Sequence, residues 1–160
     1  MILTRLKSME FKELFSVLKI FIRRPRYIYP TYRATSKTMQ ICEKLYPQKH
    51  HKNGRENAFR HALWNYLICK FCFPISGNLN TVRTWSDQFT QLHEKLSPNK
   101  ELAKAMDLHN NRVGQVLFTK KEHSVKEIIE ILQATMREAV PITKPKQVEQ
   151  AKKKLVFIKD

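Results

Sequence analysis

The spacing of apolar residues near the start of the chain is that of an amphipathic helix. Between residues 11 and 23, apolar side chains recur every three or four positions, and charged side chains occupy the opposite face. Pro25 ends this pattern, because a proline inside a helix removes a backbone hydrogen bond. We therefore expect a basic amphipathic helix within residues 1–26 and a single helical domain over residues 27–160.

Arginine and tyrosine alternate in the next segment, which Pro25 and Pro30 interrupt. The two prolines predict an irregular segment over residues 27–32. Two interpretations stay open for it. It is either a loop strapped across the core with buried tyrosine rings, or a surface that meets lipid headgroups or stacked bases.

A short helix is predicted over residues 36–45, and the polar run 48–54 predicts a loop. This run contains the adjacent pair His50 and His51. Neighbouring histidines can bind a metal ion, but on an exposed loop they are usually only solvated.

The middle of the chain predicts one helix that is buried on nearly every side, at about residues 56–73. Pro74 is expected to end it, and residues 75–82 read as a connection. A helical stripe over residues 85–96 follows, and then a helix that Ser97 and Pro98 start and that continues to about residue 118.

A capping box marks the start of the next helix, because Ser124 is followed three residues later by Glu127. Pro141 is expected to close that helix. Residues 155–158 are apolar and predict either a short strand or a last helical turn. With only three glycines in 160 residues, the chain is predicted to be all-α. We expect a single compact domain of about five or six helices around the central one, with a short C-terminal strand as an option.

The chain is strongly basic, with a formal net charge of +16. Residues 1–55 hold 13 basic and 3 acidic side chains, so +10 of this charge lies in the first third. A basic surface attracts lipid headgroups, phosphate-containing substrates or nucleic acid, and charge alone does not choose among them. We expect an anionic partner. The oligomeric state is not predicted.

The three cysteines lie within apolar helical patterns, which predicts buried, reduced thiols in a cytosolic setting. No apolar run approaches the length of a membrane span, and no signal peptide is recognised. We expect a cytoplasmic protein. The alternative is a peripheral protein at the inner face of the membrane.

Polar and titratable side chains interrupt three of the predicted helices. On the central helix, positions 57, 61, 64, 65 and 68 share one face, so His61 is expected to point inward. His93 falls on the apolar stripe of the next helix, and Glu94 lies at its border. On the third helix, Asp107 shares a face with Asn110, Asn111 and Gly114, and His109 lies on the flank. Gly114 is expected to allow a close helix contact.

Three interpretations of this cluster stay open. Histidine and carboxylate groups from three helices can bind a divalent metal, with asparagines orienting the ligands. They can also form a metal-free acid and base pair. Finally, they can form a buried hydrogen-bond network that fixes the helix packing without chemistry. The cofactor therefore stays unknown, with a divalent metal as the candidate.

At these residues the chain resembles an uncharacterised bacterial domain family, found as small proteins and at the ends of toxin-like secreted proteins. The shared pattern is Ala-Phe-Arg-His-Ala-x-Trp-Asn at residues 58–65, His-Glu at 93–94 and Met-Asp-x-His-Asn-Asn-x-x-Gly at 106–114. The resemblance covers about residues 54–118. It implies that these stretches form one site and does not name a reaction. Asn57 stands where the pattern has aspartate.

Our leading hypothesis is a small hydrolase with an interior His, Asp and Glu site, acting on a phosphate-containing or lipid-linked substrate. The alternative is a non-enzymatic basic module that binds nucleic acid or an anionic membrane surface. The expected catalytic residues are His61, His93, Glu94, Asp107 and His109, of which all but Glu94 are metal-ligand candidates. The expected binding residues are Arg60, Asn65, Asn110 and Asn111, with Arg60 suited to an anion by its bidentate fork.

Overall fold

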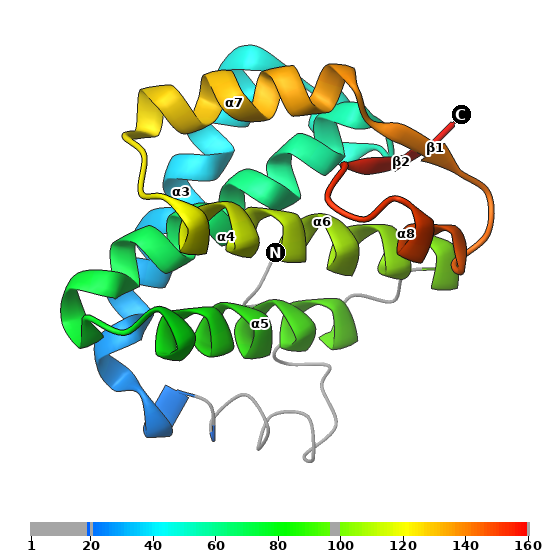
Figure 1. The fold of residues 1–160 in the computed structure, drawn as a ribbon. Coiled ribbons are helices and arrows are strands. Elements are labelled where there is room, and N and C mark those ends of the chain that lie inside the picture. Colours follow the sequence, from blue (N-terminus) through cyan, green and yellow to red (C-terminus); the bar gives the residue numbers. More distant parts are fainter. Residues whose placement is uncertain (1–18, 20, 97–99, 160) are drawn as a thin grey trace.

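The fold is mostly helical, as the sequence predicts (Figure 1). The computed structural model describes residue 19, residues 21–96 and residues 100–159. The predicted N-terminal helix lies almost wholly outside this range, and its described residues 19 and 21–23 are helical. The main helices are α3 (Ile28–Leu45), α4 (Arg55–Ser76), α5 (Leu79–Leu96), α6 (Glu101–Lys120) and α7 (Val125–Arg137).

Helix α4 is the centre of the fold and packs against α3, α5, α6 and α7. Its buried side chains lie on nearly every side, which confirms the predicted central helix. The helix continues beyond Pro74 to Ser76, so its predicted end was too early. It ends at Gly77, which adopts φ of 61° and donates its N–H to the Phe73 carbonyl at 2.8 Å. Glycine takes this left-handed conformation without a steric penalty, so it caps the helix after the proline.

The predicted irregular segment at residues 27–32 is wrong. A short 3-10 helix, η1 (Pro25–Tyr27), leads directly into α3 at Ile28. Pro30 fits because it lies in the first turn, where backbone N–H groups have no partner within the helix. Of the tyrosines, Tyr27 is buried against Trp85, whereas Tyr29 and Tyr32 are exposed.

The two helices that follow α4 also differ in their bounds from the prediction. Helix α5 begins at Leu79, so the predicted connection over residues 75–82 shortens to a brief turn. The predicted cap at Ser97 and Pro98 lies outside the described residues, and α6 runs from Glu101. The capping box is confirmed, since the Ser124 hydroxyl accepts from Glu127 N and the Glu127 carboxylate accepts from Ser124 N.

A small parallel sheet lies at one end of the fold, together with the short helix α8 (Gln147–Gln150) (Figure 1). Strand β1 (Val140–Ile142) pairs with β2 (Val156–Ile158), which confirms the C-terminal strand. Asn110 on α6 attaches β2 to the helices, because its side chain donates to the Val156 carbonyl and accepts from the Val156 N–H.

Gly114 sets the distance between α4 and α6. A Cβ atom at this position would lie 2.0 Å from the carbonyl oxygen of Ala62. The two backbones therefore touch at a point where any side chain would clash, which confirms the predicted close contact. This approach brings residues of α6 one and two turns earlier next to the His61 side of α4.

Cys42, Cys69 and Cys72 are buried and free, as predicted. Burial raises the pKa of each thiol, to about 11 for Cys72 and about 12 for the other two. None of the helices in the described part of the chain is long and apolar enough to cross a membrane.

Candidate functional site

Three titratable side chains from three helices meet in the interior. His61 comes from α4, Glu94 from α5 and Asp107 from α6, and one ligand atom of each lies within 4.8 Å of the others. The Nε2 atom of His61 lies 3.2 Å from Oδ1 of Asp107. All three side chains are buried, with at most 4 % of each residue exposed. We call His61, Glu94 and Asp107 the acid–histidine cluster.

A chain of amide hydrogen bonds fixes the tautomer of His61. The side chain of Asn65 lies 3.1 Å from the carbonyl oxygen of His61, which can only accept, so the NH₂ group of Asn65 must face it. The same NH₂ group donates to Asn111 at 2.6 Å, so the oxygen of Asn111 faces Asn65.

That Asn111 oxygen also lies 3.0 Å from Nδ1 of His61. Because an amide oxygen can only accept, Nδ1 of His61 must carry the proton. The Nε2 atom of the neutral ring then holds a lone pair, and this atom faces Asp107. An outer group that holds one ring nitrogen in this way is the usual support of a metal-binding or proton-accepting histidine.

The oxygen of Asn65 is surrounded by donors that hold the amide in place. It accepts hydrogen bonds from Ser86 at 2.8 Å, from Gln115 at 3.1 Å and from Thr90 at 3.4 Å. Ser86, Thr90 and Gln115 are buried and were not expected from the sequence. Their positions form no motif in the sequence, and only a three-dimensional contact links them to Asn65.

Arg60 lies beside the acid–histidine cluster and is half-buried. Its Nη2 donates to Oδ1 of Asn57 at 3.0 Å and contacts Nε2 of His61 at 3.1 Å. The guanidinium therefore occupies the same lone pair that faces Asp107. It also connects the buried cluster with the protein surface.

Burial controls the protonation of the cluster. It lowers the pKa of His61 well below the usual value, and the nearby Arg60 adds to this. Burial and the neighbouring Glu94 carboxylate raise the pKa of Asp107 to about 8, against the opposing charge of Arg60. Near neutral pH, His61 and Asp107 are therefore both uncharged.

The side-chain NH₂ group of Asn111 makes no hydrogen bond to the described residues. The side chain itself is buried. A buried donor without a partner is costly, so such a group commonly serves a ligand or an ordered water.

Two of the expected site residues, His109 and Asn110, are bonded elsewhere. His93 was expected on the apolar stripe but is exposed, with a T-shaped ring contact to Trp64, whereas Glu94, expected at the border of the stripe, is buried. His109 points elsewhere, because its Nε2 donates to the Lys154 carbonyl at 2.8 Å. Asn110 is bonded to the backbone of β2 and has a structural role.

A basic groove of about 650 Å³ runs between α5, α6 and the segment before η1. Its floor includes Trp85 and Leu92, and no acidic side chain lines it among the described residues. His61, Glu94 and Asp107 do not line the groove, although Lys95 and Leu108 are the sequence neighbours of Glu94 and Asp107 on α5 and α6. The basic side chains that line it are Lys19, Arg23, Arg24, Lys95 and Lys104.

Comparison with known proteins identifies the domain family of the chain. No curated protein and no solved structure gives a significant match. The model of a family described as a domain of unknown function (DUF6973) matches residues 18–140, and the chain therefore belongs to this family.

Proposed function

We propose that the protein is a metal-dependent hydrolase in which His61, Glu94 and Asp107 bind a divalent cation. The observation that carries this proposal is the convergence of one imidazole nitrogen and two carboxylates within 4.8 Å in a buried space. The fixed tautomer of His61 supports it, because Asn111 holds Nδ1 and leaves Nε2 for the cation.

One nitrogen and two carboxylate ligands suit a first-row transition metal such as Zn²⁺ or Mn²⁺. Three protein ligands leave at least one position for water, and a bound cation lowers the pKa of that water so that it can act as a nucleophile. The unpartnered NH₂ group of Asn111 is available to an oxygen atom at the same place. These features favour hydrolysis over a purely structural role.

The cation would replace the contact between Arg60 and His61. Arg60 would then keep only the weaker partner Asn57 and could turn its guanidinium toward an anionic substrate. Arginine binds phosphate and carboxylate groups through two parallel hydrogen bonds. Arg60 is therefore the proposed link between the buried cation and the substrate.

We propose a phosphate-containing substrate because of the basic groove. Among the described residues, five basic side chains and no acidic one line this groove, which favours an anion, and the apolar side chains of Trp85 and Leu92 offer a contact for an organic group. The motif shared with the resembling bacterial domains includes all three proposed ligands. The presence of all three ligands in one motif supports a common site. We also propose, from the same resemblance, a relation to toxin-like proteins.

The direct test compares wild type with Asp107→Asn. Because Asp107 is neutral at pH 7 without metal, asparagine keeps the shape and charge of that state. The variant should fold, with a stability equal to that of wild type near pH 4 and higher than that of wild type at pH 7, and Zn²⁺ or Mn²⁺ should raise its melting temperature less than that of wild type. Hydrolysis of a generic phosphodiester or phosphomonoester probe should be lost in parallel.

An equal response of both proteins to every cation would remove the metal from the proposal. Retained, salt-sensitive binding of nucleic acid or anionic vesicles, together with no hydrolysis, would favour the non-enzymatic module instead. Reversing the charge of Lys95 and Lys104 tests the groove separately, since this change should weaken substrate binding and leave cation binding intact.

A further inference from the structure

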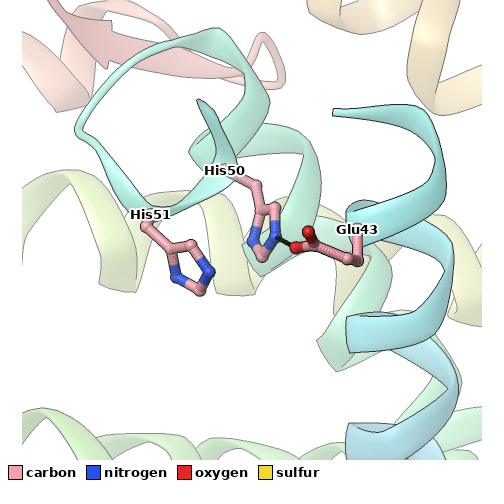
Figure 2. Close-up of side chains that lie close together, drawn as sticks. All are labelled: Glu43, His50 and His51. Carbon is pink, nitrogen blue, oxygen red and sulfur yellow. Dashed lines mark hydrogen bonds and ion pairs between the residues drawn. The ribbon is translucent and has the colours of Figure 1, made fainter. Parts of the chain in front are cut away.

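A second group of metal-binding side chains lies outside the acid–histidine cluster. Glu43 in the last turn of α3 meets His50 and His51 of the 3-10 helix η2 (Lys49–His51). One ligand atom of each residue lies within 4.8 Å of the other two. Figure 2 shows the ring of His50 between Glu43 on one side and His51 on the other.

His50 is an unusual loop residue because it is completely buried. Its Nε2 lies 3.0 Å from a carboxylate oxygen of Glu43, and its Nδ1 has no hydrogen-bond partner among the described residues. The His50 and His51 rings lie 4.0 Å apart between centroids. The sequence alone favoured two solvated histidines here, whereas the fold buries one and holds the other against it.

From this convergence we infer that Glu43, His50 and His51 form a second binding site for a divalent transition-metal ion, with Zn²⁺ as the best-suited cation. Two imidazoles and one carboxylate are a common ligand set for Zn²⁺, and three ligands leave an open position for water or an outside group. The unpartnered nitrogen of the buried His50 ring is an independent sign of a missing ligand, because buried polar atoms normally have a partner.

The carboxylate of Glu43 suits this role, because it already lies 3.0 Å from Nε2 of His50. Glu43 supplies the negative charge that a cation needs, and it is exposed enough to adjust its side chain.

The second site differs from the first in its place in the fold. It joins the end of α3 to the segment that precedes α4, whereas the acid–histidine cluster joins α4, α5 and α6. Metal binding at Glu43, His50 and His51 would therefore hold the two segments that flank the start of α4. Zn²⁺ should increase the resistance of this region to unfolding.

The test uses the full chain and Zn²⁺ alone, with Asp107→Asn as background so that the first site is silent. Titration calorimetry of this variant should show one bound Zn²⁺ per chain. Adding His51→Ala should lower the affinity at least about tenfold, and Glu43→Gln should also weaken binding. Lys52→Ala removes an exposed residue next to His51 and serves as the matched control, with unchanged affinity.

Nuclear magnetic resonance gives a second readout that does not depend on stability. Zn²⁺ should shift the ring signals of His50 and His51 in the Asp107→Asn protein and leave those of His123 in place. Absence of Zn²⁺ binding in this background, or affinity that is the same with and without His51, would overturn the second site. Loss of the first site alone would leave these results unchanged, so the two proposals fail separately.

Discussion

The Nε2 atom of His61 and Oδ1 of Asp107 lie 3.2 Å apart, and their surroundings move the two pKa values in opposite directions. His61 becomes a weaker base and Asp107 a weaker acid. Without a cation, the pair is therefore a neutral imidazole beside a protonated carboxyl group near pH 7, rather than an ion pair. A metal ion would therefore have to displace both the proton of Asp107 and the contact of Arg60 with Nε2 of His61.

The first prediction concerns the free energy of unfolding as a function of pH. The pKa of Asp107 rises from 3.8 to about 8 in the folded protein, so the folded state binds a proton that the unfolded state has lost. The stabilisation from this proton is complete below about pH 4 and disappears as the pH rises toward about 8. Wild type should thus lose up to about 1.4 kcal/mol per pH unit relative to Asp107→Asn in this interval.

Urea unfolding of both proteins in the presence of a chelator measures this difference. The lowered pKa of His61 acts with the opposite sign below about pH 6.5. Because His61 is present in both proteins, its contribution cancels in the comparison. Parallel stability curves for wild type and Asp107→Asn would show that Asp107 is already ionised in the folded protein.

The second prediction concerns the affinity for Zn²⁺. A cation at the acid–histidine cluster must displace the proton of Asp107, so binding should strengthen by up to about tenfold per pH unit between pH 6 and 8. Competition with a chelator of known affinity at several pH values measures this slope. Affinity that does not change with pH, after correction for the chelator, would mean that Asp107 is not a ligand.

The third prediction concerns the amide that orients His61. Replacement of Asn65 by alanine removes the group that Ser86, Gln115 and Asn111 contact, and leaves their buried polar atoms unpaired. We expect a loss of about 2–4 kcal/mol in the free energy of unfolding. Asn80 is exposed in the first turn of α5, so Asn80→Ala is the matched control and should stay within about 0.5 kcal/mol of wild type. Equal effects would mean that the amide chain contributes little.

The sequence predicts the parts of this fold that depend on local pattern. The sequence pattern predicts that α4 is buried on nearly every side and that Ser124 starts a helix with a capping box. Both predictions are confirmed. The start of α3 was missed because Pro30 usually breaks a helix, and only its position in the first turn makes it harmless. The end of α4 was misplaced because Gly77, and not Pro74, provides the cap.

The site was predicted only in part for a similar reason. Periodicity gives the face of a helix to within about one residue, and His93 and Glu94 are neighbours at the edge of the apolar stripe. Packing against α6 decides between them and buries Glu94. His109 was expected near Asp107 because both are on α6, but its partner is the backbone of Lys154, 45 residues later. Contacts over such distances have no signal in one sequence.

The fourth prediction tests the close contact between α4 and α6. Gly114→Ala places a methyl group against the Ala62 backbone, where it has no room, so α6 must shift away from α4. We expect a loss of about 3 kcal/mol or more, and a weaker Zn²⁺ site, because the shift moves Asp107 away from His61. Gly77→Ala is the comparison, because a Cβ atom at Gly77 has open space around it. This substitution adds only backbone strain and should lower the free energy of unfolding by about 1–2 kcal/mol. A smaller loss for Gly114→Ala than for Gly77→Ala would refute the contact.

The last prediction concerns Asn57, which accepts a hydrogen bond from Arg60 one turn later on α4. Arg60 divides its Nη2 between Asn57 at 3.0 Å and Nε2 of His61 at 3.1 Å. A carboxylate at position 57 forms a charge-assisted bond to the guanidinium that is about twice as strong as the bond to an amide. Asn57→Asp should therefore draw Arg60 away from His61, free the lone pair and raise the Zn²⁺ affinity about tenfold or more.

A second variant separates the two causes of such an increase. Arg60→Gln keeps a polar side chain but removes the positive charge and most of the reach toward Nε2. If release of the lone pair limits binding, this variant should also raise the Zn²⁺ affinity, although it lacks the added carboxylate. If only Asn57→Asp has an effect, the carboxylate acts as a further ligand. Unchanged or weaker binding in both variants would show that Arg60 does not compete with the cation for Nε2 of His61.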